Sequence, residues 1–208
     1  DQAPAVWFAY SPNRKGEHPQ AHLKSYRGIL QADAYAGYNA VYESGRVGEA
    51  ACWAHVRRKF FDIHQAQASP MAGEAVRRIG TLYAIEAELR GKPPDVRVQG
   101  RQQSQVILDE LHRWLINLRG KVSQKSDLAL AIGYALNQWS ALIRYVSDGR
   151  IEIDNNAAER SLRAVALGRK NFLFSGSDAG GERAAAFYSL IGTAKLNGMD
   201  PEAYLRTV

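Results

Sequence analysis

The feature that most constrains the fold of this chain is a change in the period of its apolar residues. In three stretches apolar residues recur every three or four positions, which places them on one face of an amphipathic helix. A polar linker at 90–100 separates the first two stretches. The pattern predicts an all-helical segment at 67–147 whose apolar stripes pack into a core. The three stretches are 71–90, 101–119 and 126–147.

Shorter apolar runs before this segment have the composition of strands. β-branched and aromatic residues dominate AVWFAY at 5–10, and apolar runs recur at 28–35 and 49–56. Residues between these runs, such as 20–26, leave room for short helices. Strands that alternate with helices tend to pair in parallel. The expected fold class is therefore α/β, with the helical segment as an insertion.

The same patterns divide the chain into three parts. A first part at 1–66 and a second at 148–208 flank the helical insertion at 67–147. Near the end of the chain we expect a helix at 182–196. Asp200 stands directly before a proline, which is a typical helix start and predicts one more short helix.

Composition limits the class of protein only broadly. Lys and Arg number 27 against 21 Asp and Glu, so the net charge is +6, which weakly favours a polyanionic partner. No run approaches the ~20 apolar residues of a membrane span. The single cysteine, Cys52, excludes an intrachain disulfide and fits a reducing cytosol. The chain starts almost directly in an apolar run, so we expect a fragment or a chain whose upstream part has been removed.

Two carboxylates occupy positions where catalytic or ligand-binding residues are often found. Asp33 follows an apolar run, and ligands gather at the carboxyl edge of parallel strands. Glu159 lies one turn inside a helix start, in the stretch IEIDNNAAER. Each also has a purely structural interpretation, Asp33 as a turn residue and Glu159 as the partner of Asn156 in a capping box. If the two converge, they need a shared proton or a bound cation, and oxygen ligands suit Mg²⁺ or Mn²⁺.

Several basic residues could hold DNA phosphates, or could simply form a solvated surface. Cys52 and His55 form a C-x-x-H pattern, but the further Cys or His of a zinc site is missing, so we expect no zinc. The glycine-rich run at 176–182 could cradle a phosphate. The basic residues are Arg57, Arg58, Lys59, Arg160, Arg163, Arg169 and Lys170.

Four motifs together resemble the transposases of the insertion sequence 66 family. They follow one another in the family's order and cover nearly the whole chain. They are LQADAYAGYNAVYE, ACWAHVRRKFFDIH, EIDNNAAERSLR and GRKNFLFSGSDAGGERAAAFYSLIGTAKLNGMDP. The resemblance implies membership of the wider DDE group, whose catalytic core is ribonuclease H-like, here with a helical insertion.

The resemblance also implies roles for particular residues. Asp33 is then the second Asp of the catalytic triad and Glu159 its Glu, and both bind Mg²⁺ or Mn²⁺, with two ions in the complete enzyme. His55 and the basic residues named above then contact double-stranded DNA. The residues that support the site are Cys52, Trp53, Asn155 and Asn156.

The family's first catalytic Asp lies on a strand upstream of residue 5. The chain is therefore expected to hold an incomplete core with two of the three acids, and to be inactive or nearly so by itself. The complete enzyme is expected to cut transposon ends with water and to join the freed 3′-hydroxyl to target DNA. It would work as a homo-oligomer with accessory proteins of the element, in the bacterial cytoplasm at the nucleoid.

Two other functions fit the same residues. The chain could be a non-catalytic remnant that binds DNA or takes part in assembly, keeping the basic surface and the insertion. It could also be a ribonuclease H-like nuclease or resolvase that hydrolyses DNA without strand transfer. DNA products with joined 3′-ends would separate transposition from simple hydrolysis.

Overall fold

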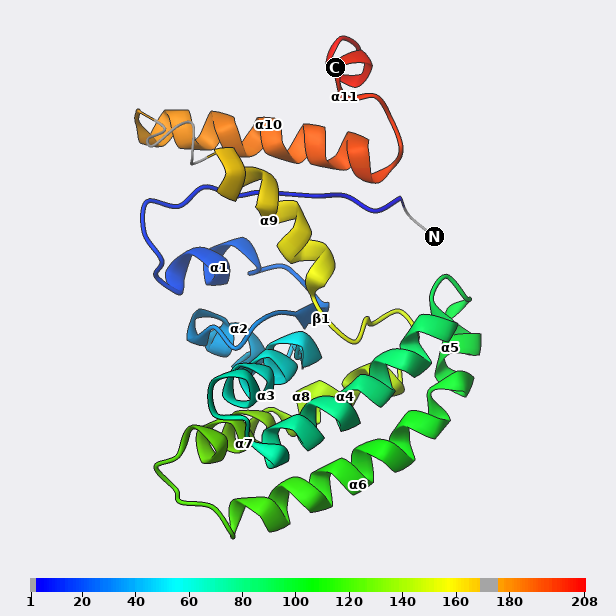
Figure 1. Cartoon of the computed structure of the whole chain (residues 1–208). Helices are drawn as coiled ribbons and strands as arrows, with labels where there is room; N and C mark the ends of the chain where they lie inside the picture. Colours follow the sequence, from blue (N-terminus) through cyan, green and yellow to red (C-terminus); the bar gives the residue numbers. More distant parts are fainter. Residues whose placement is uncertain (1–2, 169–175) are drawn as a thin grey trace. The chain divides into compact units, whose positions relative to one another are not determined.

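The computed structural model describes residues 3–168 and 176–208. These residues are mostly helical, with one pair of strands among them (Figure 1). They fall into two compact units. The larger unit is Leu23–Asn155, and the smaller combines the described residues of Asp1–His22 with those of Asn156–Val208. No helix in the described part of the chain is both long enough and apolar enough to span a membrane.

The larger unit contains a parallel pair of strands. β1 (Gly28–Gln31) and β2 (Val47–Ala50) run side by side, and their last residues are paired. The connection between them passes through η1 (Ala36–Tyr38) and α2 (Asn39–Glu43). A parallel pair joined by a helical crossover agrees with the expected α/β class.

The prediction of one strand over 49–56 is wrong beyond Ala50. α3 (Trp53–Gln67) begins directly after this strand. Its buried residues are spaced as one face of a helix: they are Trp53, Val56, Phe60 and Ile63. An apolar run that is too short to show its period can start a helix as readily as a strand.

The helices expected between 67 and 147 are present, with two differences. The linker at 90–100 itself contains a short helix, and the third stretch is broken at Gln138. Ser69 and Ser126 cap two of the helices, because each hydroxyl accepts a backbone N–H of the first turn. The elements are α4 (Pro70–Leu89), α5 (Pro94–Gly100), α6 (Gln102–Arg119), α7 (Asp127–Asn137), α8 (Trp139–Ile143) and η2 (Arg144–Val146).

One hydrophobic core joins these helices to the strand-bearing part. Trp53 is fully buried and packs edge-on against Trp139, with ring centroids 5.7 Å apart. Its indole N–H donates to Leu142 O at 2.9 Å. Leu82 of α4 and Leu111 of α6 belong to the same core, and burial of each such side chain stabilises the fold by about 1.5–3 kcal/mol. The three-part division of the chain stays a prediction.

The smaller unit is built from helices and an extended segment. The glycine-rich run at 176–182 is not a separate loop but mostly the first turns of α10, where Ser177 Oγ accepts the Gly180 N–H at 3.1 Å. Asp200 caps the last helix as predicted, accepting a backbone N–H at 2.8 Å. The first helix begins earlier than the expected run at 20–26. The helices are α1 (Glu17–His22), α9 (Asn156–Gly168), α10 (Asp178–Leu196) and α11 (Pro201–Leu205).

The prediction of a strand at 5–10 is wrong. The Val6 N–H donates to Thr193 Oγ1 at 3.0 Å, and the Phe8 N–H donates to Ser189 Oγ at 2.8 Å. Both hydroxyls belong to α10. Side chains of a helix therefore take backbone hydrogen bonds that a neighbouring strand would take, and within residues 3–168 and 176–208 no strand pairs with this segment.

Candidate active site

Asp33 lies just beyond the carboxyl ends of β1 and β2. The last pair of the ladder is Gln31 with Ala50, and the Ala32 N–H extends it by donating to Ala50 O at 3.2 Å. Asp33 and Cys52 each stand two residues beyond this last pair. The Asp33 side chain is exposed. A carboxylate on the carboxyl edge of parallel strands is therefore accessible to a ligand.

Tyrosine rings surround the chain directly after Asp33. Tyr35 and Tyr38 pack edge to face with centroids 5.6 Å apart, and Tyr38 and Tyr42 are 6.4 Å apart. Burial raises the pKa of Tyr38, and the negative charge of Asp33 raises it further. Burial also raises the pKa of Tyr42, with Glu49 and then Asp33 contributing. These rings were not predicted as part of the site, although the sequence DAYAGYNAVY places three tyrosines close after Asp33.

α3 starts at this edge and carries three adjacent basic residues. They fall between the buried Val56 and Phe60, so they lie on the solvent side of the helix, and all three are exposed. This placement leaves them accessible to phosphates and is equally that of an ordinary solvated helix face. The three residues are Arg57, Arg58 and Lys59.

Lys59 also contacts an aromatic ring near Asp33. Its Nζ lies 4.4 Å from the ring centroid of Tyr134 on α7, within the range of a cation–π interaction. Burial raises the pKa of Tyr134, a hydrogen bond with Gln138 lowers it in part, and the negative charge of Asp33 adds to the rise. Lys59, Tyr134 and Asp33 therefore belong to one region of the larger unit.

The C-x-x-H residues occupy the start of α3. Cys52 is buried, and burial raises the pKa of its thiol, so the thiol stays protonated at neutral pH. Trp53 is part of the core, and His55 is half-buried. Across residues 3–168 and 176–208, no group of three or more His, Cys, Asp or Glu is arranged to hold a metal ion.

Glu159 lies in the first turn of α9, half-buried. The helix begins at Asn156, so Asn155 takes the preceding position and Glu159 falls one residue beyond the capping-box spacing. Asn155 Oδ1 is buried and has no hydrogen-bond partner among the described residues, so it does not cap the helix. Asp33 belongs to the larger unit and Glu159 to the smaller, so their convergence stays a prediction.

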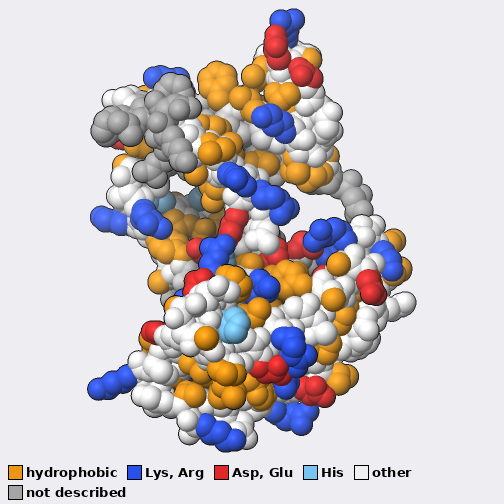
Figure 2. Space-filling model, viewed as in Figure 1, with side chains coloured by type: hydrophobic (Ala, Val, Ile, Leu, Met, Phe, Trp, Pro, Cys, Tyr) orange, Lys and Arg blue, Asp and Glu red, His pale blue; other side chains and the backbone are white. Residues whose placement is uncertain are grey.

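The remaining predicted DNA-contacting residues lie on or after α9. Arg160 and Arg163 are exposed on that helix. Arg169 and Lys170 lie outside the described residues. On the face drawn in Figure 2, Lys and Arg side chains are scattered among hydrophobic and acidic ones instead of forming one continuous basic area.

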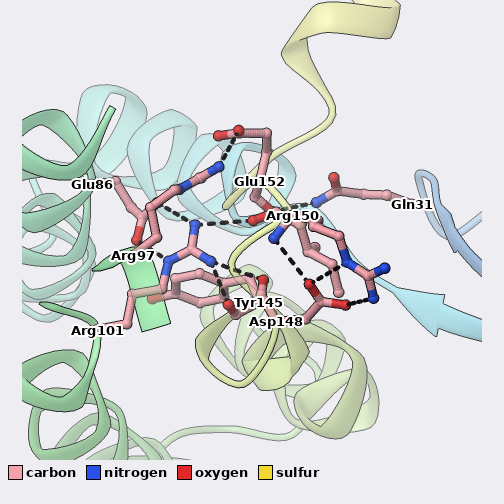
Figure 3. Close-up of polar contacts among 9 residues, drawn as sticks. Gln31, Glu86, Arg97, Arg101, Tyr145, Asp148, Arg150 and Glu152 are labelled. Carbon is pink, nitrogen blue, oxygen red and sulfur yellow. Dashed lines mark hydrogen bonds and ion pairs between the residues drawn. The ribbon is translucent and has the colours of Figure 1, made fainter. Parts of the chain in front are cut away.

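A buried ion cluster holds the segment that leaves the helical part, residues 145–154, which we call the exit segment. Arg101 is fully buried and uses every N–H of its guanidinium group. Two bonds go to the Glu86 carboxylate, each at 2.7 Å (Figure 3). The other three go to backbone carbonyls of the exit segment at 2.6–3.0 Å, those of Tyr145, Asp148 and Ile151.

Arg97 extends this cluster toward the strands. It binds Glu152 at 2.8 Å and Glu86 at 3.4 Å. Gln31, the last residue of β1, donates through Nε2 to Glu152 O at 2.7 Å (Figure 3). The exit segment is thus tied to the carboxyl edge that carries Asp33. The cluster was not predicted from the sequence, because Arg97 lies in the polar linker while Glu86 and Arg101 lie near the ends of the amphipathic stretches, where charged residues are usually exposed.

Two more bonds fix the end of the exit segment. The backbone N–H of Trp53 donates to Ile153 O at 3.1 Å, and the Tyr83 hydroxyl donates to Asp154 Oδ2 at 3.0 Å. Burial raises the pKa of Tyr83, and Asp154 raises it further through its charge and this hydrogen bond. The last residues before α9 are therefore held by α3 and α4.

A shallow hollow of about 420 Å³ lies beside β1 but does not include Asp33. Arg27 and Arg150 contribute to its lining. Arg150 is already paired with Asp148 at 2.7 Å, and this hydrogen-bonded pair holds the pKa of Asp148 at about 2. Because one of its two cations is neutralised, the hollow is a weaker candidate site than the edge at Asp33.

The chain is similar to known proteins over nearly its whole length. The chain is 40% identical to the uncharacterized protein y4hP of Sinorhizobium fredii, over 99% of this chain and 40% of the relative. It is 40% identical to the uncharacterized protein y4jD of the same species, over 99% of this chain and 42% of the relative. The chain thus spans about two-fifths of the length of these curated relatives. No solved structure matches it.

The family comparison covers most of the chain. The family model described as Transposase IS66 family matches residues 1–183. That range includes the parallel strands, the helical part, the exit segment and α9. Asp33, the basic residues of α3 and Glu159 all fall within that range. The chain therefore belongs to the IS66 family of transposases.

Proposed function

We propose that this chain is part of the catalytic region of a DDE transposase that cuts and joins DNA with Mg²⁺ or Mn²⁺. In this proposal the core is ribonuclease H-like, Asp33 and Glu159 are the second and third acids, and the first Asp lies on a strand upstream of residue 5. The observation that carries the proposal is the position of Asp33. It is an exposed carboxylate directly after a parallel strand, in a chain of this family.

The donor chemistry at this edge fits a hard cation. Asp33 offers an exposed carboxylate at the edge, and elsewhere in the same unit Asn155 Oδ1 is a buried oxygen without a hydrogen-bond partner among the described residues. Oxygen donors are those that Mg²⁺ and Mn²⁺ prefer. Asp33 and Glu159 would hold the metal, with two ions in the complete enzyme. Ions held there would supply activation of the attacking hydroxyl and stabilisation of the departing oxygen.

The other residues of the chain would hold the DNA. Arg57, Arg58 and Lys59 are exposed on α3, the helix that starts at the edge carrying Asp33, and would neutralise backbone phosphates without reading sequence. His55, two residues before Arg57 on the same helix, would contact the same DNA strand. Arg160 and Arg163 would do so from the helix of Glu159. We include Arg169 and Lys170 on the strength of the family resemblance alone.

The proposed substrates, oligomeric state and cellular location also follow from the family resemblance. The substrates would be the duplex ends of a bacterial insertion sequence and a target duplex. The complete enzyme would act as a homo-oligomer, with accessory proteins of the element, at the nucleoid in the cytoplasm.

A joining assay tests the proposal. The chain is linked to the upstream strand that carries the first Asp and incubated with labelled transposon-end DNA and a target plasmid. We expect cleavage and covalent joining of 3′-ends with Mg²⁺ and neither with EDTA. Cleavage without joining would instead support a nuclease or resolvase. Metal-independent DNA binding with no cleavage would support the non-catalytic role.

A further inference from the structure

An aromatic and cationic surface lies next to Asp33, and we call it the tyrosine platform. Its members are Tyr38, Tyr42, Tyr134 and Lys59, all in the larger unit. The ring centroids of Tyr38 and Tyr42 lie 6.4 Å apart, and Lys59 Nζ lies 4.4 Å from the ring centroid of Tyr134. The three rings are half-buried, so each keeps part of its surface in solvent.

The platform is more than a packing contact of the fold. The Tyr38 hydroxyl makes no hydrogen bond within the described part of the chain, so no internal bond requires a phenol there. Tyr38 and Tyr42 are not among the residues of the apolar core, whereas Tyr134 packs against that core and keeps part of its surface in solvent. Exposed ring surface beside a carboxylate is available to a ligand.

The chemistry of the platform selects one class of ligand. Flat rings stack on a nucleobase whatever its sequence, because every base has a π-face. Lys59, with Arg58 next to it on α3, supplies positive charge for the phosphate of the same nucleotide. Asp33 repels a phosphate that comes close without a cation, so a simple anion is disfavoured beside it.

We propose that Tyr38 and Tyr134 stack an unpaired nucleobase of the DNA strand next to Asp33, while Lys59 holds the phosphate of that nucleotide. This proposal rests on the proposed function and adds the form of its substrate. A base inside a duplex has both faces covered by its neighbours and offers none to a ring. The DNA at Asp33 must therefore be single-stranded or locally opened.

Binding of short oligonucleotides tests this directly, in EDTA so that no metal is needed. Fluorescence anisotropy with labelled (dT)₁₂ is compared between wild type, Tyr38→Leu and Tyr38→Phe. We expect Tyr38→Leu to bind about 10-fold more weakly, the loss of one base–ring stack, and Tyr38→Phe to bind as wild type. Tyr134→Leu should weaken binding by a similar factor.

Tyr26→Leu is the matched control. Tyr26 is also partly exposed, at 39%, but it stands before the amino end of β1, away from Asp33. The Tyr26→Leu variant should bind (dT)₁₂ as tightly as wild type. Equal binding by wild type, Tyr38→Leu and Tyr134→Leu would overturn the proposal, and so would equal weakening by Tyr26→Leu. Circular dichroism confirms that each variant is folded.

A stacking signal separates the contact from a change of fold. An oligonucleotide that carries 2-aminopurine should lose fluorescence on binding wild type and Tyr38→Phe, but not on binding Tyr38→Leu at saturating protein. An unquenched wild-type complex would contradict stacking. Because the assay contains no metal and measures no cleavage, it can fail while Asp33-dependent strand cleavage succeeds, and the reverse.

Discussion

Replacing Arg101 with leucine is expected to lower the free energy of unfolding by about 3–5 kcal/mol. Arg101 is fully buried, and its partner Glu86 is only 4% exposed. Leucine would leave the Glu86 carboxylate buried opposite Arg97 alone, whose nearest nitrogen is 3.4 Å away. It would also remove the donors to three carbonyls of the exit segment. A buried charge without its partner costs far more than a lost surface pair.

Urea denaturation followed by circular dichroism measures the effect. Arg77→Leu is the matched control, since Arg77 is exposed and pairs with Glu74 on the surface of α4. We expect the control to unfold close to wild type. The double variant Arg101→Leu/Glu86→Leu should be more stable than Arg101→Leu alone, because it leaves no orphaned charge. Equal midpoints for Arg101→Leu and Arg77→Leu would show that the cluster does not hold the exit segment.

Asp33→Asn is expected to lower strand cleavage by more than about 100-fold. Changes to residues that only support a metal ligand already cost about 10–100-fold, and loss of a ligand itself should cost more. Asparagine keeps the size of the side chain and removes its charge. Because Asp33 is exposed and outside the core, the variant should unfold like wild type. The loss of strand cleavage would then come from a defect in the catalytic step and not from unfolding.

The measurement is the initial rate of cleavage of end-labelled DNA by the chain joined to its upstream strand. Asp62→Asn is the control, since Asp62 is an exposed acid on α3 in the same unit. Glu159→Gln should reduce cleavage as strongly as Asp33→Asn. Activity of Asp33→Asn within a few-fold of the Asp62→Asn control would remove Asp33 from the proposed metal site.

Periodicity alone predicted much of the helical part of this chain. The stretches at 71–90 and 101–119 correspond closely to α4 and α6, because long amphipathic helices show their period many times. The short runs at 5–10 and 49–56 were assigned less well. In each, the outcome depends on partners far along the chain: α10 for the first, and the core around Trp53 for the second.

The parts of the candidate site that could be predicted are those in which a charged residue stands next to a single strand or helix in the sequence. Asp33 after an apolar run, and basic residues at the start of α3, are patterns within a few positions. The tyrosine platform and the Arg101 cluster were not predictable. Tyr134 contacts Lys59, and Arg101 contacts the exit segment, across long distances in sequence, and nothing local in the sequence marks Arg101 as buried.

Titration with Mn²⁺, followed by electron paramagnetic resonance, tests most directly whether Asp33 and Glu159 form one metal site. The protein is the chain joined to the strand that supplies the first Asp. We predict that wild type binds Mn²⁺ and that Asp33→Asn and Glu159→Gln each lose most of this binding. Binding by Glu159→Gln equal to wild type would contradict the shared site and leave Glu159 as an acid that only stabilises the start of α9.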